Sequence, residues 1–216
     1  MTYNIHHGEG TDGKLDLDRI AGVLRSAKPD LVALQEVDRR VARTGGFDQP
    51  ALLAQATGMR VVFGGNLSLG GGDYGNVILS RHPVVRQWNV SLPNPQKTEP
   101  RGLLCADVRW SGSGRLIRFS STHFDHLPPD AARLASAEAV LQQSASAPAA
   151  PALLAGDLNA TPRSAVLQKL LADWGSAGSE DLPTSPSTLP RRRIDYVLLR
   201  PRDRWRSEEH TSELQS

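Results

Sequence analysis

The chain alternates short runs of β-branched, aliphatic and aromatic residues with longer stretches whose apolar residues recur at helical spacing. Gly, Pro, Asn or Asp closes most of the short runs, which is the pattern of β-strands bounded by turns. Strands are therefore predicted at residues 1–7, 30–37, 59–66, 75–81, 84–92, 102–110, 115–124, 151–159 and 193–199.

Helices are predicted in the longer stretches. Residues 17–28 place apolar side chains on one face, and Asp16 or Asp18 can cap the first turn. The same spacing recurs in residues 130–145 and 163–175. Many strands with few crossover helices, and short turns between some strands, favour an α/β domain with mixed sheets.

Composition narrows the class of protein. With 216 residues, of which 39% are hydrophobic and 22% charged, the chain suits one compact domain with a substantial core. No apolar run is long enough to span a bilayer and the first residues lack a signal-peptide pattern, so we expect no membrane span and favour a cytoplasmic location. Cys105 is the sole cysteine and is expected in the core. A net charge of +2 is compatible with anionic substrates but is too small to indicate nucleic-acid binding.

Polar residues stand where several predicted strands end or begin. One such residue would mean little, because an isolated Glu is usually the first solvated residue of a turn and a lone His is usually structural. Several of them on separate strands are harder to ascribe to chance, since strand ends hold side chains more rigidly than loops do. They are Asn4, Glu36, His123, Asp157, Asn159 and Asp195.

The chemistry of this set favours a hard cation. Carboxylate and amide oxygens are typical ligands of Mg²⁺ or Mn²⁺. A structural zinc site is disfavoured, because the chain has one Cys and, apart from His6 and His7, no His pair at close ligand spacing. The sequence therefore predicts a site for Mg²⁺ or Mn²⁺ and a phosphate group.

Six motifs occur in order along the chain: TYNIHHG, VALQEVD, YGNVILSR, STHFDH, AGDLNATP and RRRIDYVLL. The ordered set, from Thr2 to about Arg200, resembles the endonuclease/exonuclease/phosphatase superfamily, which includes deoxyribonuclease I, exonuclease III, inositol-polyphosphate 5-phosphatases and neutral sphingomyelinases. The resemblance implies a four-layer α/β/β/α sandwich of two packed mixed sheets flanked by helices. It also implies hydrolysis of a phosphoester by in-line attack of water, with one or two Mg²⁺ or Mn²⁺ ions.

The resemblance also implies roles for single residues. Glu36 matches the family's principal metal-ligand glutamate, and Asn4 matches the asparagine beside that metal. His123 matches the histidine that hydrogen-bonds a phosphate oxygen in the transition state. Asp157 and Asn159 match the pair that orients or activates the attacking water and contacts the phosphate, and their spacing suits this because residues i and i+2 of an extended segment share a face.

Three further residues of these motifs are less specific. Arg101 can add positive charge for the phosphate, but an ordinary surface arginine is at least as good an interpretation. Asp125 and His126 could reach the rim of the site, although the two prolines that follow mark a loop and favour solvated side chains.

Asp195 interrupts an apolar strand, and a carboxylate that faces a core needs a partner. Arg191, Arg192 and Arg193 lie just before it, and a strand end open to water is the other simple explanation. In the family, the corresponding catalytic aspartate hydrogen-bonds the histidine base of a Ser-Asp-His motif on the next strand. No Ser-Asp-His follows Asp195 in this sequence, so we expect an open sheet edge beside it.

The two ends of the sequence carry separate expectations. Residues 206–216 match the in-frame translation of a common short-read sequencing adapter, so we expect an artefactual tail after a domain at residues 1–205, with His210 outside the site. The natural chain is expected to continue with one more strand, the histidine base and a metal aspartate, which would leave the printed chain impaired. Met1 is expected to be an internal methionine, because in such proteins this first motif usually follows a few more strand residues.

The sequence thus favours a monomeric phosphoesterase that depends on Mg²⁺ or Mn²⁺. The expected substrate is a small molecule, a lipid headgroup or a general phosphodiester rather than sequence-specific DNA, because residues 191–193 are the only compact basic run and aromatic residues make up 5% of the chain. A nuclease that acts on DNA or RNA is the alternative within the enzyme class. The rival hypothesis is a phosphate-binding module without catalysis, which would need neither a metal glutamate nor a water-orienting aspartate.

Overall fold

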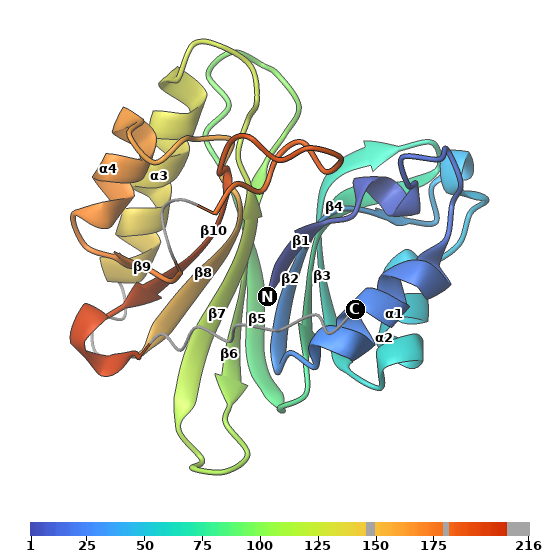
Figure 1. Cartoon of the computed structure of the whole chain (residues 1–216), viewed down its shortest axis with the longest axis horizontal. Helices are drawn as coiled ribbons and strands as arrows, with labels where there is room; N and C mark the ends of the chain where they lie inside the picture. Colours follow the sequence, from blue (N-terminus) through green and yellow to red (C-terminus); the bar gives the residue numbers. More distant parts are fainter. Residues whose placement is uncertain (146–149, 179–181, 207–216) are drawn as a thin grey trace.

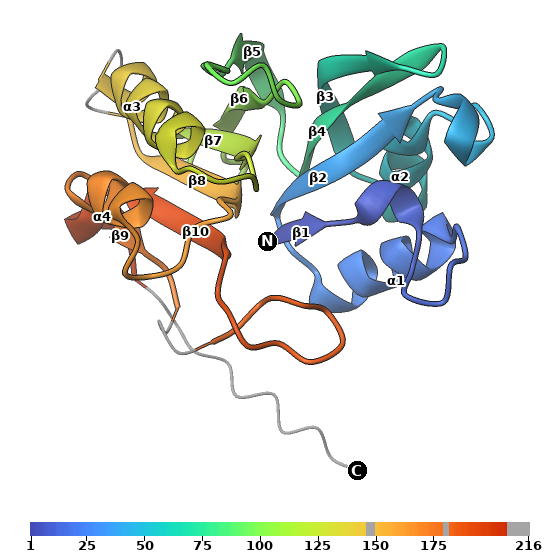
Figure 2. The ribbon, with the colours of Figure 1, turned by 90° about the horizontal axis from the view of Figure 1, so that it is seen from above.

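A computed structural model describes residues 1–145, 150–178 and 182–206; the expected tail after Arg206, with His210, lies outside the described residues. Two β-sheets pack face to face, and a pair of helices covers the outer face of each sheet (Figure 1). Seen from above, the layers follow in the order helices, sheet, sheet, helices (Figure 2). The expected α/β/β/α sandwich is confirmed.

Both sheets are mixed, because β1 runs parallel to β2 and β7 parallel to β8, while the other pairs are antiparallel. The four-stranded sheet has the order β1 (Thr2–Asn4), β2 (Leu31–Arg39), β4 (Gly72–Ser80), β3 (Arg60–Leu69). The six-stranded sheet has the order β5 (Val84–Ser91), β6 (Gly102–Arg109), β7 (Leu116–His123), β8 (Ala152–Asp157), β10 (Asp195–Arg200), β9 (Gly175–Ser176).

The strand predictions are correct in position, with three differences. β8 ends at Asp157 and Asn159 has a left-handed φ of 46°, so the expected extended segment from Asp157 to Asn159 is wrong. The predicted first strand ends at Asn4, because His6–Gly8 forms a 3-10 turn, η1. β9 is absent from the prediction, since two residues are too few to show an alternating pattern. Two further 3-10 turns are η2 (Ala42–Thr44) and η3 (Arg202–Arg204).

The helices are α1 (Leu17–Ala27), α2 (Gln49–Thr57), α3 (Ala131–Ala145) and α4 (Ala165–Leu171). Asp16 rather than Asp18 caps α1, and its carboxylate accepts the Arg19 N–H at 2.8 Å. α4 is shorter than predicted, because Ser164 caps its first turn and the helix already ends at Leu171, before Gly175 begins β9. Among the described residues, no helix is long and apolar enough to cross a membrane.

The core consists of one cluster between the sheets and one beneath each pair of helices. Val62, Ile78, Leu104 and Phe119 fill the space between the sheets. Cys105 is 1% exposed in the cluster under α3 and α4, as predicted. Burial raises the pKa of its thiol to about 11, so the thiol stays protonated and unreactive at neutral pH.

Candidate functional site

Three strands of the six-stranded sheet bring predicted site residues into one row. His123 at the end of β7 is in register with Asp157 at the end of β8, and Asp157 with Asp195 at the start of β10. Residues in register on neighbouring strands point to the same face of a sheet, so these side chains are neighbours. Gly156 permits the close approach of β8 to β7, because a Cβ there would lie 2.0 Å from the Thr122 carbonyl oxygen.

The four-stranded sheet contributes Asn4 and Glu36. Glu36 stands where the β2–β4 register shifts between Leu34 and Val37, and its φ is 59°. A β-bulge re-aims a side chain, and this left-handed backbone is costly for a residue other than Gly. The Asn4 amide nitrogen donates to Glu36 Oε1 at 2.8 Å and to Asp157 Oδ2 at 3.4 Å. This amide therefore connects the two sheets at the site.

Asp157 is the residue shared by these contacts, and it is 6% exposed. Burial raises the pKa of its carboxyl to about 7, and the charges of Asp195 and Glu36 add to the rise. The Asn159 N–H donates to Asp157 Oδ1 at 3.0 Å, and this hydrogen bond lowers the pKa of the carboxyl in part. Asn159 itself has a left-handed φ of 46°. A carboxyl with a pKa near 7 can accept or release a proton at neutral pH.

His123 is 6% exposed and contacts Arg101, which is 8% exposed, so the interpretation of Arg101 as an ordinary surface arginine is wrong. Arg101 Nη1 lies 3.0 Å from His123 Nδ1 and 2.7 Å from Glu99 Oε1. An arginine can only donate, so Nδ1 must accept and the proton of the neutral ring sits on Nε2. Burial, followed by the charge of Arg101, holds the pKa of His123 well below its usual value.

The second ring nitrogen of His123 faces Asn159 and Asp157. The Asn159 amide nitrogen donates to the Phe124 carbonyl oxygen at 3.0 Å and lies 3.2 Å from His123 Nε2. A neutral ring cannot accept at both nitrogens, and the shorter, charge-assisted contact with Arg101 is the stronger. We therefore assign the proton to Nε2, which lies 3.7 Å from Asp157 Oδ2.

Arg101→Gln is expected to raise the pKa of His123, because it removes the charge that is the second cause of the lowered value. Burial, the first cause, remains, so the pKa should stay below that of a free histidine. An NMR titration of the His123 ring measures the change. Arg43→Gln is the matched control, and a His123 pKa equal in both variants would contradict the assigned contact.

The hydrogen-bond partner found for Asp195 is Thr184. The Asp195 N–H donates to Thr184 Oγ1 at 3.2 Å. Burial raises the pKa of the Asp195 carboxyl, and a hydrogen bond with Thr184 partly offsets this rise. Arg193 donates instead to the Ala177 carbonyl oxygen at 2.8 Å. The charge of Asp195 acts on Asp157, the residue opposite it in register.

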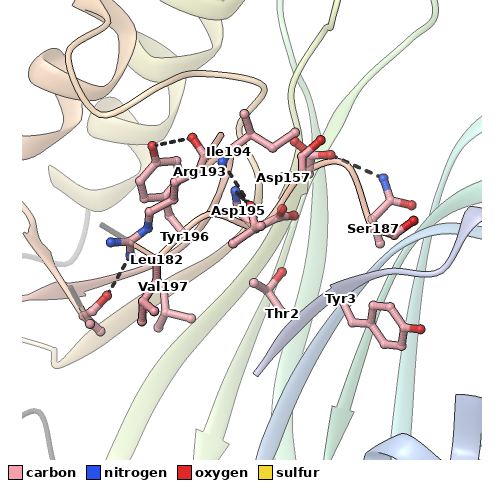
Figure 3. A pocket seen from close by; sticks show the side chains of 15 residues that line it. Thr2, Tyr3, Asp157, Leu182, Ser187, Arg193, Ile194, Asp195, Tyr196 and Val197 are labelled. Atoms are coloured by element: carbon pink, nitrogen blue, oxygen red, sulfur yellow. Dashed lines mark hydrogen bonds between the residues drawn. The ribbon is translucent and has the colours of Figure 1, made fainter. Parts of the chain in front are cut away.

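A cavity of about 570 Å³ separates β1 from β10, and both aspartates line it (Figure 3). Thr2, Tyr3 and Asn4 of β1 line its other side. In the part of the chain that is described, β1 pairs with β2 alone, and β9 covers β10 only at Leu198 and Leu199. On the β10 side, the Ala177 N–H donates to the Val197 carbonyl oxygen at 2.9 Å, and Thr184 Oγ1 accepts the Asp195 N–H. Among the described residues, no strand pairs with β10 at Asp195 on this side, as expected, but a loop covers part of the edge.

A cleft of about 390 Å³, here called the His123 cleft, contains the other site residues. Glu36, His123, Asp157, Asn159 and Arg101 line it. The sequence pattern assigns no role to several further lining residues: His6, His7, Arg43, Tyr74 and Glu99. Tyr74 lies within the YGNVILSR motif, and burial raises the pKa of its hydroxyl, so it remains a protonated donor at the cleft.

The expectation of a solvated loop after His123 is correct for one residue and wrong for the other. The His126 side chain is 61% exposed and lines the His123 cleft. Asp125 is 3% exposed, because its carboxylate accepts hydrogen bonds from Thr98 Oγ1 at 2.6 Å and from the Leu127 N–H at 2.9 Å.

The donor atoms at this end of the sandwich fit a divalent cation. The carboxylates of Glu36 and Asp157 both accept hydrogen bonds from the Asn4 side-chain amide, which brings their oxygens to one place. In addition, one ligand atom each of His6, His7 and Glu36 lies within 4.8 Å of the other two. Oxygen donors suit Mg²⁺ and Mn²⁺, and imidazole suits transition metals.

The same fold occurs in solved structures. An endonuclease/exonuclease/phosphatase from Beutenbergia cavernae DSM 12333 is 30% identical, with a TM-score of 0.75 over 93% of this chain and 63% of that chain. This chain therefore spans less than two thirds of that protein. A mannosyl-6-phosphatase of Bacteroides thetaiotaomicron VPI-5482 is 17% identical, with a TM-score of 0.75 over 93% and 84% of the two chains. The human Nocturnin catalytic domain with bound sulfate anion is 20% identical, with a TM-score of 0.70 over 91% and 79%.

A search of curated protein sequences gives no match. A sequence model of the Endonuclease/Exonuclease/phosphatase family, by contrast, matches residues 1–212. The match covers nearly the whole sequence and agrees with the sandwich and with the positions of the motifs. The chain belongs to the endonuclease/exonuclease/phosphatase family.

Proposed function

We propose that this chain hydrolyses phosphoester bonds with the help of a divalent metal ion, by attack of an activated water on phosphorus. The observation that carries the proposal is the place of Asp157, between the His123 Nε2 atom and the Asn4–Glu36 pair. A proton acceptor, a hydrogen-bond donor and metal-binding oxygens in one site are what this hydrolysis requires.

Each catalytic residue has a separate task. Asp157, with a pKa of about 7, accepts a proton from the attacking water at neutral pH. The His123 Nε2–H donates to a non-bridging phosphate oxygen, where negative charge increases in the transition state. Asn159 positions Asp157 through its N–H and presents its side-chain amide to the phosphate. Asp195 keeps the pKa of Asp157 high through its charge.

Glu36 and Asn4 are the residues proposed to hold the cation, Mg²⁺ or Mn²⁺. When bound, this ion supplies positive charge that polarises the phosphate. Arg101 lines the same cleft, adds positive charge for substrate binding and positions His123.

The proposed substrate is a small phosphoester, such as a sugar phosphate or a lipid headgroup, rather than a nucleic acid. A cleft of about 390 Å³ has the size of a small-molecule site. Within the basic run at residues 191–193, Arg193 is only 8% exposed, so the run forms no continuous basic surface. The name of the mannosyl-6-phosphatase that shares the fold is consistent with a sugar phosphate.

Metal-dependent turnover is the expected result when the chain is assayed with p-nitrophenyl phosphate, bis-p-nitrophenyl phosphate and duplex DNA. At least one nitrophenyl ester should be hydrolysed with Mg²⁺ or Mn²⁺ and not in EDTA, because the site requires the charge of the cation. Glu36→Ala should weaken the response to metal most. Glu138→Ala, which removes an acid on α3 that pairs with Lys169 outside the cleft, is its control.

Three other outcomes of these assays would contradict parts of the proposal. Turnover that EDTA does not diminish would show that the metal assignment is wrong. Preference for DNA over both esters would contradict the proposed substrate class. Phosphate binding in calorimetry without any turnover would favour the rival hypothesis of a non-catalytic phosphate-binding module.

A further inference from the structure

We propose that His6 and His7 complete the metal site at Glu36 with nitrogen donors, and that they make the site selective for Mn²⁺ and other transition metals over Mg²⁺. The inference rests on the proposed function only in that both use Glu36. One ligand atom of each of the three residues lies within 4.8 Å of the other two. An ion with bonds of ~2.1 Å separates adjacent ligand atoms by ~3–4 Å, so a small side-chain movement closes the site.

The backbone holds both imidazoles toward Glu36. His6 and His7 have left-handed φ values of 45° and 46°, and their ring centroids are 4.3 Å apart. Glu36 is left-handed as well, with a φ of 59°. A left-handed backbone at two consecutive residues other than Gly, with a third such residue facing them, is unusual. Such conformations persist where surrounding contacts enforce them.

A buried amide provides one of these contacts. Gln49, at the start of α2, is 2% exposed. Its Nε2 donates to the His7 carbonyl oxygen at 2.6 Å, and its Oε1 accepts the Asp38 N–H at 3.1 Å. Because Asp38 follows the bulge by two residues, Gln49 ties the histidine turn to the strand segment that carries Glu36.

Asn4 and Glu9 support the same turn from its two ends. Asn4 Oδ1 accepts the His6 N–H at 3.1 Å, while its Nδ2 donates to Glu36. The Glu9 carboxylate lies 3.6 Å from His7 Nε2. Histidines that bind metals commonly have a carboxylate beside their second ring nitrogen, which fixes the tautomer and increases the basicity of the ligand.

The donor set determines the metal preference. Imidazole nitrogen is a good ligand for Mn²⁺, Co²⁺ and Zn²⁺, whereas Mg²⁺ prefers oxygen donors and retains its waters. A site of one carboxylate and two imidazoles should therefore bind Mn²⁺ more tightly than Mg²⁺. Loss of the imidazoles should remove most of this difference.

Calorimetric titration of the whole chain with Mn²⁺ and with Mg²⁺ tests the preference. The main variant is His6→Asn/His7→Asn, because Asn tolerates the left-handed backbone and lacks an imidazole. We expect the unmodified chain to bind Mn²⁺ at least ~10-fold more tightly than Mg²⁺, and the double variant to lose Mn²⁺ affinity by ~10–100-fold. Its Mg²⁺ affinity should change by less than about 3-fold. His126→Asn, another imidazole of the cleft, is the control and should leave Mn²⁺ affinity unchanged.

Pulsed EPR of bound Mn²⁺ detects the ligands directly. Hyperfine coupling to imidazole nitrogen is expected in the unmodified chain and should be absent in the double variant. If the double variant does not fold, His6→Asn alone, at an exposed position, should lower Mn²⁺ affinity and reduce the coupling. The inference would be overturned if the unmodified chain showed no nitrogen coupling. It would also be overturned if the Mn²⁺ affinities of the unmodified chain and the double variant lay within about 2-fold of each other.

These measurements need no turnover, so the two proposals can fail separately. Nitrogen-coupled Mn²⁺ in a chain that hydrolyses no phosphoester would support the histidine ligands and refute the proposed function. Metal-dependent hydrolysis by a chain whose Mn²⁺ shows no nitrogen coupling would do the reverse.

Discussion

His123→Ala is expected to lower kcat by ~10²–10³-fold, with a smaller effect on KM, because it removes a hydrogen-bond donor that acts mainly in the transition state. The donor is Nε2, which carries the proton because Arg101 occupies Nδ1, while burial and then the charge of Arg101 lower the pKa of His123 and keep the ring neutral. In the ground state the phosphate oxygen carries less charge, so the lost hydrogen bond costs less there.

Steady-state kinetics with bis-p-nitrophenyl phosphate and saturating metal measure this effect. His82→Ala is the control, because His82 lies beyond the end of β4, beside Asp30 and Trp110. Thermal unfolding of both variants verifies that each is folded at the assay temperature. A kcat of His123→Ala within a factor of about two of the unmodified chain would show that His123 does not contact the reacting phosphate.

Local patterns predict most of the elements of this fold, because strands and helices leave their own periodicity in the sequence. Besides the two-residue β9, the prediction misses α2, since its apolar residues are not concentrated on one face. Its signals were the cap at Asp48, Pro50 in the first turn and Gly58 after the last residue. Ends of this kind mark a helix even where periodicity does not.

The row of His123, Asp157 and Asp195 was accessible from the motifs, because each residue stands at a strand end. The raised pKa of Asp157 cannot be predicted from the motifs, since it depends on burial and on the register that places Asp195 opposite it. Burial of Arg101 against His123 depends in the same way on how the neighbouring segments pack.

The proposed metal ligands show a second limit of sequence reasoning. A β-bulge at Glu36 and left-handed backbone at His6 and His7 leave no periodic signal, since none of these residues is Gly. The adjacent histidines were visible as a pair, but their approach to Glu36 depends on long-range contacts such as those of Gln49.

Asp157→Asn is expected to stabilise the metal-free protein at about pH 8 by about 2–4 kcal/mol, while the difference should be small at about pH 3. The carboxyl has an ordinary pKa of 3.8 and a native pKa of about 7. Between these values the native state binds the proton and the unfolded state has released it. Stability therefore falls by ~1.4 kcal/mol per pH unit as the pH rises through this range, and it is constant above it.

Urea unfolding in EDTA, from about pH 3 to about pH 8, measures the slope, and Asp125→Asn provides a control of opposite sign. Burial raises the pKa of Asp125, but hydrogen bonds from Thr98 and the Leu127 N–H lower it overall. Ionised Asp125 thus stabilises the fold above its unfolded pKa, and this stability is lost as the pH falls through the native pKa. Asp125→Asn should be the less stable variant at neutral pH and approach the unmodified chain in acid. A stability difference for Asp157→Asn that does not change with pH would show that the carboxyl has the same pKa in the native and the unfolded state. It would contradict the raised pKa on which the role of Asp157 as proton acceptor at neutral pH rests.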